Sequence, residues 1–215
     1  MIIAVDGPSA AGKGTLARGL AKALGYHFLD TGSLYRAVGL MMLRHDKALD
    51  DAGAAAQFAA ALDLPSIRDG ELRNEDVAHA ASRISVYPKV RANLLQFQRD
   101  FARKAPGAVL DGRDIGTVVC PDADLKFFVT AATDVRARRR FDELKGQGQD
   151  VAYEAVFEDV MARDERDATR TTAPTAMADD AIMIDTSELT ADEVLKAVLD
   201  AVSYTHLTLP TSDLV

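Results

Sequence analysis

The sequence of 215 residues predicts a doubly wound α/β domain built on a five-stranded parallel sheet. Three observations lead to this prediction. Short, almost entirely apolar runs recur along the chain, stretches with helical periodicity separate them, and a glycine-rich loop joins the first run to the first helix. Near-continuous apolar runs are typical of parallel strands that helices cover on both faces.

Five short segments are the expected strands. Each is rich in apolar residues, and we predict that each is buried. They are Ile2–Val5, His27–Leu29, Ala108–Leu110, Leu125–Thr130 and Ile182–Ile184.

The first expected helix follows the glycine-rich loop. Leu16, Leu20 and Leu24 repeat every four residues, and Gly25 follows as a C-terminal stop. A later helix is predicted by four apolar residues with the spacing of one helix face, namely Val90, Leu94, Phe97 and Phe101.

The last expected helix begins at a capping box made by Thr190 and Glu193. Its apolar pattern runs from Val194 and stops after Val202. The remaining residues, 204–215, differ in composition from the domain before them. We treat them as a tail of doubtful origin and assign them no function.

Composition limits the classes of function. The chain has 25 Lys and Arg residues against 33 Asp and Glu residues, a formal net charge of −8, which argues against general nucleic acid binding. A few arginines gathered in one cleft can still bind phosphate. No apolar run approaches the roughly 18 to 20 residues of a membrane span. The N-terminal MIIAVDG has no signal-peptide features. We therefore expect a cytoplasmic protein, a monomer, with neither membrane nor nucleic acid as a partner.

Cysteine and histidine indicate no metal centre. The single cysteine, Cys120, excludes an internal disulfide and is expected to serve packing. The histidines show no metal-ligand spacing; they are His27, His45, His79 and His206.

The strongest motif is the glycine-rich loop at residues 7–15, called the phosphate loop below. It starts two residues after an apolar strand and opens into a helix, the context in which backbone N–H groups and a helix N-terminus bind phosphate. Lys13 adds a positive charge for the β and γ phosphates. The expected ATP-binding residues are Gly7, Pro8, Ser9, Ala10, Ala11, Gly12, Lys13, Gly14 and Thr15.

One residue of this loop departs from the common pattern. Ser or Thr usually follows the lysine, but here Gly14 stands before Thr15. Which hydroxyl contacts a metal ion is therefore open. The chain has no Asn-Lys-x-Asp segment to bind guanine, and its many arginines favour transfer to a phosphorylated acceptor over hydrolysis. Two alternatives remain: another small-molecule kinase on this scaffold, and an ATP-binding regulator without an acceptor.

Further motifs carry a family resemblance. They are the Gly-Lys-Gly-Thr ending of the phosphate loop, Leu29–Arg36 (LDTGSLYR), Ala80–Ser82 with Val90 and Arg91, Asp111–Thr117 (DGRDIGT), and Arg163–Asp167 (RDERD) through Arg170. In this order, from Ile2 to about Val202, they resemble the bacterial cytidylate kinases of the P-loop nucleoside monophosphate kinase group.

The resemblance implies both architecture and activity. It implies one kinase domain over residues 1–203, with a nucleoside-monophosphate-binding insert at about 35–105 and a helical lid at about 134–170. It also implies Mg²⁺-dependent, in-line transfer of a phosphoryl group from ATP to CMP or dCMP. The insert between Leu62 and Asp76 is shorter than in many bacterial relatives and leaves no room for the small sheet found there.

The resemblance also assigns catalytic and phosphate-binding roles. Arg36 and Arg113 follow predicted strands, so both are expected at the carboxyl edge of the sheet beside the phosphate loop. The expected catalytic residues are Lys13, Arg36, Arg113, Arg163 and Arg170. Arg36 and Arg113 would bind the acceptor phosphate, for which a guanidinium offers two parallel hydrogen bonds.

The other expected CMP contacts concern the sugar and the base. Asp167 is assigned to the sugar hydroxyls, whereas Ser82, Arg91 and Asp114 match the family's base-reading positions. At roughly 100° per residue, Arg163, Asp167 and Arg170 share one face if the helix continues that far. A salt-bridge ladder on a helix surface is the alternative interpretation of these three residues.

Weaker candidates complete the set. Arg136 and Arg138–Arg140 begin the lid, and one or more could reach ATP, although a solvated helix face explains most of the run equally well. Thr15, Asp30 and Asp111 are candidates for binding Mg²⁺, mainly through water, because this ion seldom needs a full protein cage.

Overall fold

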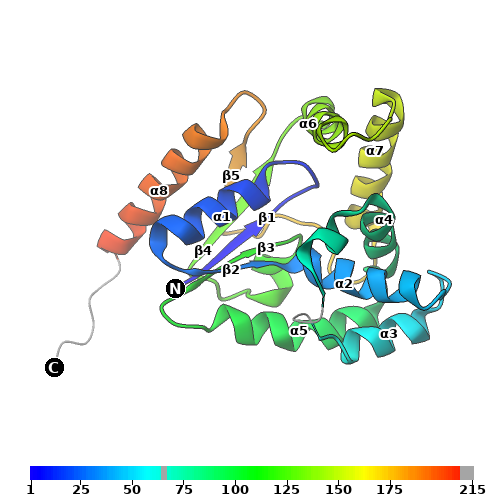
Figure 1. Ribbon diagram of the computed structural model, residues 1–215. Helices are drawn as coiled ribbons and strands as arrows, with labels where there is room; N and C mark the ends of the chain where they lie inside the picture. Colours follow the sequence, from blue (N-terminus) through cyan, green and yellow to red (C-terminus); the bar gives the residue numbers. More distant parts are fainter. Residues whose placement is uncertain (64–66, 209–215) are drawn as a thin grey trace.

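In the computed structural model, which describes residues 1–63 and 67–208, five parallel strands form one sheet in the order β2-β3-β1-β4-β5 (Figure 1). The strands are β1 Ile2–Asp6, β2 His27–Asp30, β3 Ala108–Asp111, β4 Leu125–Thr130 and β5 Ile182–Asp185. The predicted fold class and all five strands are confirmed, and four of the strands are one residue longer at the carboxyl end than predicted.

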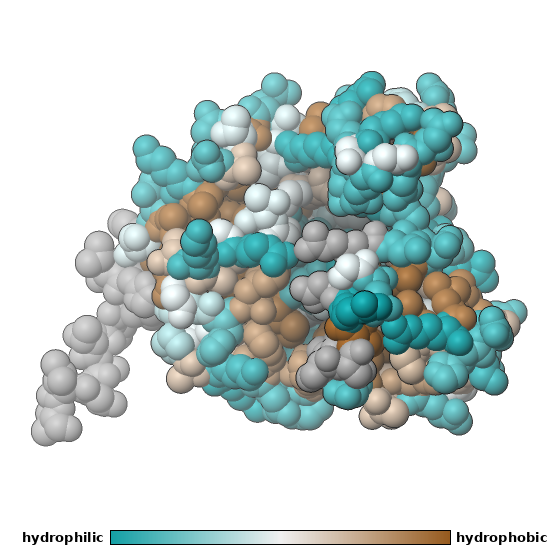
Figure 2. Space-filling model, in the orientation of Figure 1, coloured by the Kyte–Doolittle hydropathy of each residue, from teal (hydrophilic) through white to brown (hydrophobic). Residues whose placement is uncertain are grey.

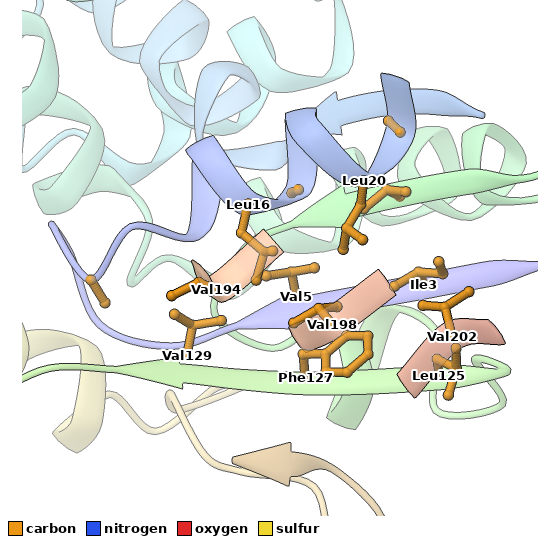
Figure 3. Packing of buried hydrophobic residues seen from close by; sticks show 14 residues of the cluster. Ile3, Val5, Leu16, Leu20, Leu125, Phe127, Val129, Val194, Val198 and Val202 are labelled. Atoms are coloured by element: carbon orange, nitrogen blue, oxygen red, sulfur yellow. The ribbon is translucent and has the colours of Figure 1, made fainter. Parts of the chain in front are cut away.

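Helices cover both faces of the sheet, as a doubly wound fold requires. On one face, α1 (Lys13–Leu24) and α8 (Ala191–Thr208) lie side by side; on the other, α5 (Pro88–Ala102) packs against β1, β2 and β3 (Figure 1). Figure 3 shows Val198 of α8 beside Phe127 of β4, and Leu16 of α1 beside Val194 of α8, within one buried cluster. This packing fixes the strand order, and therefore fixes which loops meet at the carboxyl edge.

Two groups of helices lie beside this core. Between β2 and β3 the chain forms α2 (Thr31–Arg44), α3 (Ala52–Ala60), the short η2 (Asp69–Arg73) and α4 (Glu75–Ile84) before α5. Between β4 and β5 it forms α6 (Thr133–Gly146) and α7 (Tyr153–Thr169), and α7 stands above α4 in the view of Figure 1. A single π-helical turn, η3 (Ile115–Val119), follows β3.

The capping predictions are confirmed. Gly25 ends α1 in a left-handed conformation with a φ of 67°. At the start of α8 the Glu193 backbone N–H donates to the Thr190 hydroxyl oxygen at 3.3 Å, and the Thr190 N–H donates to the Glu193 carboxylate at 2.8 Å. These bonds satisfy N–H groups that the first turn of a helix leaves free.

Three local predictions are wrong. β5 is not buried, because it is an edge strand with β4 as its one neighbour; Ile182 is 46% and Met183 63% exposed. Phe97 is 45% exposed, because the buried stripe of α5 follows Val90, Leu94, Gln98 and Ala102 at steps of four residues. The last helix does not stop after Val202 but continues to Thr208. Residues 209–215 of the suggested tail lie outside the described residues.

A search of the described residues finds no helix that is long and apolar enough to cross a membrane.

Candidate nucleotide-binding site

A large cavity opens at the carboxyl end of the sheet. Its volume is about 1220 Å³, and its walls come from the phosphate loop, the starts of α1 and α2, the end of β3, and α4, α6 and α7. Most of the predicted site residues line it: Ser9, Ala10, Gly12, Lys13, Gly14, Thr15, Asp30, Arg36, Ser82, Arg91, Asp111, Arg113, Asp114, Arg163, Asp167 and Arg170. Gly7, Pro8 and Ala11 of the loop do not line it. Figure 2 shows mostly hydrophilic residues over α6 and α7, above the middle of the molecule.

The phosphate loop is held by close packing at its first residue. Gly7 has a φ of 140°, and a Cβ atom added there would lie 1.9 Å from the carbonyl oxygen of Val129. Gly12, with a φ of 89°, is the N-cap of α1 and supplies no side chain to its first turn. The free N–H groups of that turn therefore remain available to an anion.

Lys13 lies inside the loop. Its ammonium donates to the carbonyl oxygen of Pro8 at 2.6 Å, and its side chain is 5% exposed. Burial and the nearby charge of Arg113 together lower the pKa of Lys13 to about 7, whereas the charge of Asp111 acts in the opposite direction. A phosphate group in the loop would supply the negative charge that this buried ammonium needs.

The structure explains the unusual Gly14. A Cβ atom at this position would lie 3.2 Å from the Oδ2 atom of Asp111. The first turn of α1 therefore packs directly against a buried carboxylate at the end of β3, and a side chain at position 14 would have to push it aside. Thr15, one residue later, is exposed to the cavity.

The expected base-reading residues come together on the opposite wall. The Arg91 guanidinium donates to Asp114 at 2.5 Å, and both side chains are 8% exposed. Arg170 approaches the other carboxylate oxygen of Asp114 at 3.5 Å. The hydroxyl of Ser82, on α4, accepts a hydrogen bond of 3.2 Å from Arg166 of α7. These four elements (α4, α5, the β3 loop and α7) thus converge on one polar wall.

The expected sugar and phosphate residues form a second cluster. Arg113 donates to Asp167 at 2.9 Å, and Arg170 lies 3.8 Å from the same carboxylate. Burial alone would raise the pKa of Asp167, but the charges of Arg113 and Arg163 outweigh it and hold that pKa below its usual value. The helix does not continue to Arg170, whose extended backbone follows the end of α7. The surface ladder is therefore wrong: Asp167 and Arg170 are buried at the cavity wall.

Arg163 differs from its neighbours in its hydrogen bonding. Within the described part of the chain, its buried Nε atom has no hydrogen-bond partner. Burial and the charge of Arg113 together lower the pKa of Arg163 to about 10, and the carboxylates of Asp167 and Asp159 offset only part of this effect. A cavity wall with an excess of guanidinium groups is suited to a ligand that carries several negative charges.

Arg36 and Asp30 form an ion pair on the remaining wall. Asp30 is the N-cap of α2 and also accepts a hydrogen bond of 3.2 Å from the Ser33 N–H. No group of three or more His, Cys, Asp or Glu residues in the described ranges could by itself hold a metal ion.

The basic run at the start of α6 is a solvated face only in part, since Arg138 is exposed, Arg139 and Arg140 are half-buried and Arg136 is buried. Arg136 is buried, donates to the carbonyl oxygens of Ala131 (2.9 Å) and Ser9 (3.3 Å), and pairs with Asp164 of α7 at 2.6 Å. It therefore connects the phosphate loop to α7. The other three arginines also have partners: Arg138 stacks on Tyr153, Arg139 donates to Thr186 and Arg140 pairs with Glu75 of α4.

Sequence reasoning assigns no role to Arg166 or Asp6, and it does not single out Arg136 within the basic run. Arg166 lies within the Arg163–Asp167 motif, so its position in that motif could have identified it as a site residue. Arg136 carries no signal that separates it from the arginines beside it. Asp6 directly precedes the phosphate loop, yet only the structure shows what its carboxylate contacts.

The fold and the site together define a P-loop kinase: a parallel sheet, a phosphate-binding loop after the first strand, and an arginine-rich wall across a cavity from that loop. The chain belongs to the cytidylate kinase family, whose model matches residues 3–204.

Individual relatives agree with this assignment. The cytidylate kinase of Rhodospirillum rubrum is 51% identical over 95% of this chain and 98% of its own length. That of Caulobacter vibrioides is 51% identical over 91% and 92%. Among solved structures, a gluconokinase from Sinorhizobium meliloti superposes with a TM-score of 0.51 at 13% identity, over 98% of this chain and 97% of that one, a likeness of fold alone.

Proposed function

We propose that this protein transfers the terminal phosphoryl group of ATP to CMP or dCMP and releases ADP with CDP or dCDP. The observation that carries the proposal is that the phosphate loop and four arginines, Arg36, Arg113, Arg163 and Arg170, line the same cavity, which the Asp114–Arg91 pair also lines. Membership of the cytidylate kinase family supports the same reaction.

The phosphate loop would bind the donor. Lys13 and the N–H groups at the start of α1 would neutralise the β and γ phosphates, and the bond from Lys13 to Pro8 would give way to the nucleotide. Arg136 would hold the phosphate loop at a fixed position relative to α7, because it contacts both Ser9 and Asp164.

The arginine wall would bind the acceptor and the transferred group. Arg36 and Arg113 would bind the acceptor phosphate. Arg163 and Arg170 would stabilise the negative charge on the phosphoryl group during its transfer. The unpartnered Nε of Arg163 supports this role, because a buried donor without an acceptor favours a ligand oxygen. The acceptor phosphate is ionised at neutral pH, so no general base is needed.

Asp114, Arg91 and Ser82 would select cytosine, and Asp167 would bind the sugar hydroxyls. The N4 amino group of cytosine donates, whereas its O2 and N3 atoms accept. A carboxylate can accept from N4, and a guanidinium and a hydroxyl can donate to the ring. Uracil presents a carbonyl where cytosine has the amino group, so it would leave the Asp114 carboxylate without its hydrogen bond.

Mg²⁺ would enter with ATP. The carboxylates of Asp111 and Asp30 and the hydroxyl of Thr15 are oxygen donors of the kind this ion prefers, and all three residues line the cavity. The ion would supply charge neutralisation between the phosphates and be held mainly by phosphate and water oxygens.

The helices outside the core would act as two covers. Residues at about 35–105 would form the acceptor-binding insert, and residues at about 134–170 the lid. Contacts between α4 and α6 (Glu75 and Arg140) and between α4 and α7 (Ser82 and Arg166) support this division. We further propose that the protein works in the cytoplasm as a monomer, without nucleic acid or membrane, in accord with its acidic composition.

An acceptor panel tests the function. ADP release from ATP and Mg²⁺ is measured with CMP, dCMP, UMP, AMP or no acceptor. We expect rapid turnover with CMP and dCMP, slow turnover with UMP and almost none without an acceptor. Preference for a different acceptor would indicate another small-molecule kinase, and ATP consumption independent of an acceptor would indicate a regulator.

A further inference from the structure

Asp6 is the last residue of β1, directly before the phosphate loop, and its carboxylate contacts the turn that follows β3. Its two oxygens accept hydrogen bonds from the backbone N–H groups of Ile115 and Gly116, each at 2.7 Å. The side chain is 5% exposed. One buried carboxylate thus joins the end of β1 to a turn that lies more than 100 residues further along the chain.

The two N–H groups directly follow Asp114. Asp114 is the residue before the π turn η3, and it supplies no side-chain cap to that turn. Its own carboxylate is instead directed toward Arg91 and Arg170. Because Asp6 satisfies the N–H groups that Asp114 leaves free, the Asp114 side chain can face the cavity.

The backbone on both sides of this contact has little room to move. Gly7, next to Asp6, is packed against Val129, and a Cβ atom on Gly116 would lie 3.4 Å from the Asp6 carboxylate. The Gly112 N–H also donates to the carbonyl oxygen of Val5 at 3.0 Å. The segment from Gly112 to Gly116, which contains Arg113 and Asp114, is therefore held to β1 at both ends.

We propose that Asp6 is a positioning residue for the acceptor site: its carboxylate fixes the backbone after Asp114 and so sets the direction of the Asp114 and Arg113 side chains toward the bound nucleotide. This inference rests on the proposed function of the site. Asp6 is not among the residues that line the cavity, so in this proposal it acts on the transfer only through the backbone that carries Arg113 and Asp114.

The hydrogen bonds from Ile115 and Gly116 require two acceptor oxygens, which the ionised carboxylate of Asp6 provides. Burial raises the pKa of Asp6 to about 6, while the two N–H donors act in the opposite direction. The group is therefore charged at neutral pH, and charge-assisted bonds to two N–H groups are stronger than neutral ones. An asparagine of the same size offers one acceptor and places an NH₂ group against the second N–H.

The test compares Asp6→Asn with Asp124→Asn as a matched control. The Asp124 carboxylate accepts a hydrogen bond of 2.6 Å from the Ile2 N–H, at the opposite end of β1. Both substitutions remove a carboxylate that accepts a hydrogen bond from the backbone at one end of β1. Only Asp6→Asn changes a contact with the segment that carries Arg113 and Asp114. KM for ATP, and kcat and KM for CMP and UMP, are measured for both variants.

For Asp6→Asn we expect kcat/KM for CMP to fall about 100-fold, as small misplacements of a binding group do. The ratio of CMP to UMP activity should fall about tenfold, and KM for ATP should stay within about threefold. Asp124→Asn should keep the wild-type ratio. An unchanged ratio in Asp6→Asn, or a loss confined to ATP, overturns the role of Asp6. Wild-type protein without CMP-dependent turnover contradicts the proposed function instead.

A second measurement needs no variant, so it applies even if Asp6→Asn fails to fold. Amide hydrogen exchange of Ile115 and Gly116 is followed in the wild-type protein with CMP or with a non-hydrolysable ATP analogue. If Asp6 couples this turn to the acceptor, CMP should slow both amides at least about tenfold more than the analogue does. Equal protection by the two ligands overturns the inference.

Discussion

The guanidinium of Arg91 and the carboxylate of Asp114 form an ion pair of 2.5 Å in which both side chains are 8% exposed. They come from different elements, the first turn of α5 and the turn after β3. A buried pair of this kind gains little stability over an apolar pair of the same shape, because desolvation offsets most of the attraction. The pair instead places a hydrogen-bond acceptor, the Asp114 carboxylate, beside a hydrogen-bond donor, the Arg91 guanidinium, at the wall of the cavity.

The first prediction concerns the selectivity of this pair. Asp114→Ala should lower kcat/KM for CMP by about 100-fold or more and for UMP by less than about tenfold, because only cytosine has the N4 amino group that would donate to the carboxylate. Steady-state kinetics with both acceptors measure the two losses. Asp122→Ala, at an exposed acidic residue of the following segment, is the control and should leave both unchanged. Equal losses for CMP and UMP would refute the role of Asp114.

That variant also has a cost in stability. Removing Asp114 leaves Arg91 buried without its carboxylate, for which about 3–5 kcal/mol is typical. Kinetics are therefore compared well below the melting temperature of each variant, as determined by circular dichroism.

The second prediction concerns the unpartnered Nε atom of Arg163. Arg163→Met should raise the melting temperature of the ligand-free protein, because a half-buried arginine whose buried Nε has no hydrogen-bond partner among the described residues is replaced by an apolar side chain of similar length. The same change should lower kcat about 100-fold or more, because it removes charge stabilisation of the transferred group.

Calorimetry and a coupled assay measure the two effects of Arg163→Met. The control is Arg138→Met on α6, whose guanidinium stacks on Tyr153 outside the cavity. It should lose about 0.5–1 kcal/mol of cation–π stabilisation and keep its kcat. A lower melting temperature for Arg163→Met would contradict this prediction, because it would show that Arg163 stabilises the ligand-free protein.

The third prediction separates two glycines of the phosphate loop. Both have positive φ, but a Cβ atom on Gly7 would collide with the backbone of Val129, whereas one on Gly12 would meet nothing within 4 Å. Gly12→Ala should cost about 1–2 kcal/mol of unfolding free energy from backbone strain alone. Gly7→Ala should cost clearly more, about 3 kcal/mol or above, because the strand and the loop must move apart. Urea unfolding compares them, and equal losses would contradict the packing argument.

The fourth prediction concerns Cys120. Its side chain is 3% exposed, and burial raises the pKa of its thiol to about 11, so very little thiolate exists at pH 8. Alkylation by iodoacetamide should therefore be at least about 100-fold slower in the folded protein than in urea, and should speed up as the pH rises toward 11. Equal rates in folded and unfolded protein would show that this cysteine is accessible after all.

The class of the fold and most residues of the candidate site can be predicted from the sequence. Apolar runs alternating with helical periodicity are local properties, and they were enough for five strands and the helices that cover them. The phosphate loop was recognisable because its residues are contiguous and its function depends on backbone geometry. The acceptor residues, from Arg36 to Arg170, were found through family motifs, and the structure places them around one cavity.

The pairing of ionised side chains can be seen only in the folded chain. The pairs Arg91–Asp114, Arg113–Asp167 and Arg136–Asp164 join residues from separate elements, and no local pattern states that one arginine of a basic run is buried while the next is not. The exposure of β5 followed from its place at the sheet edge rather than from its apolar composition. The same holds for Asp6, whose hydrogen bonds exist because β1 and β3 are neighbours in the sheet. Packing of distant segments sets such contacts, and packing depends on the whole chain.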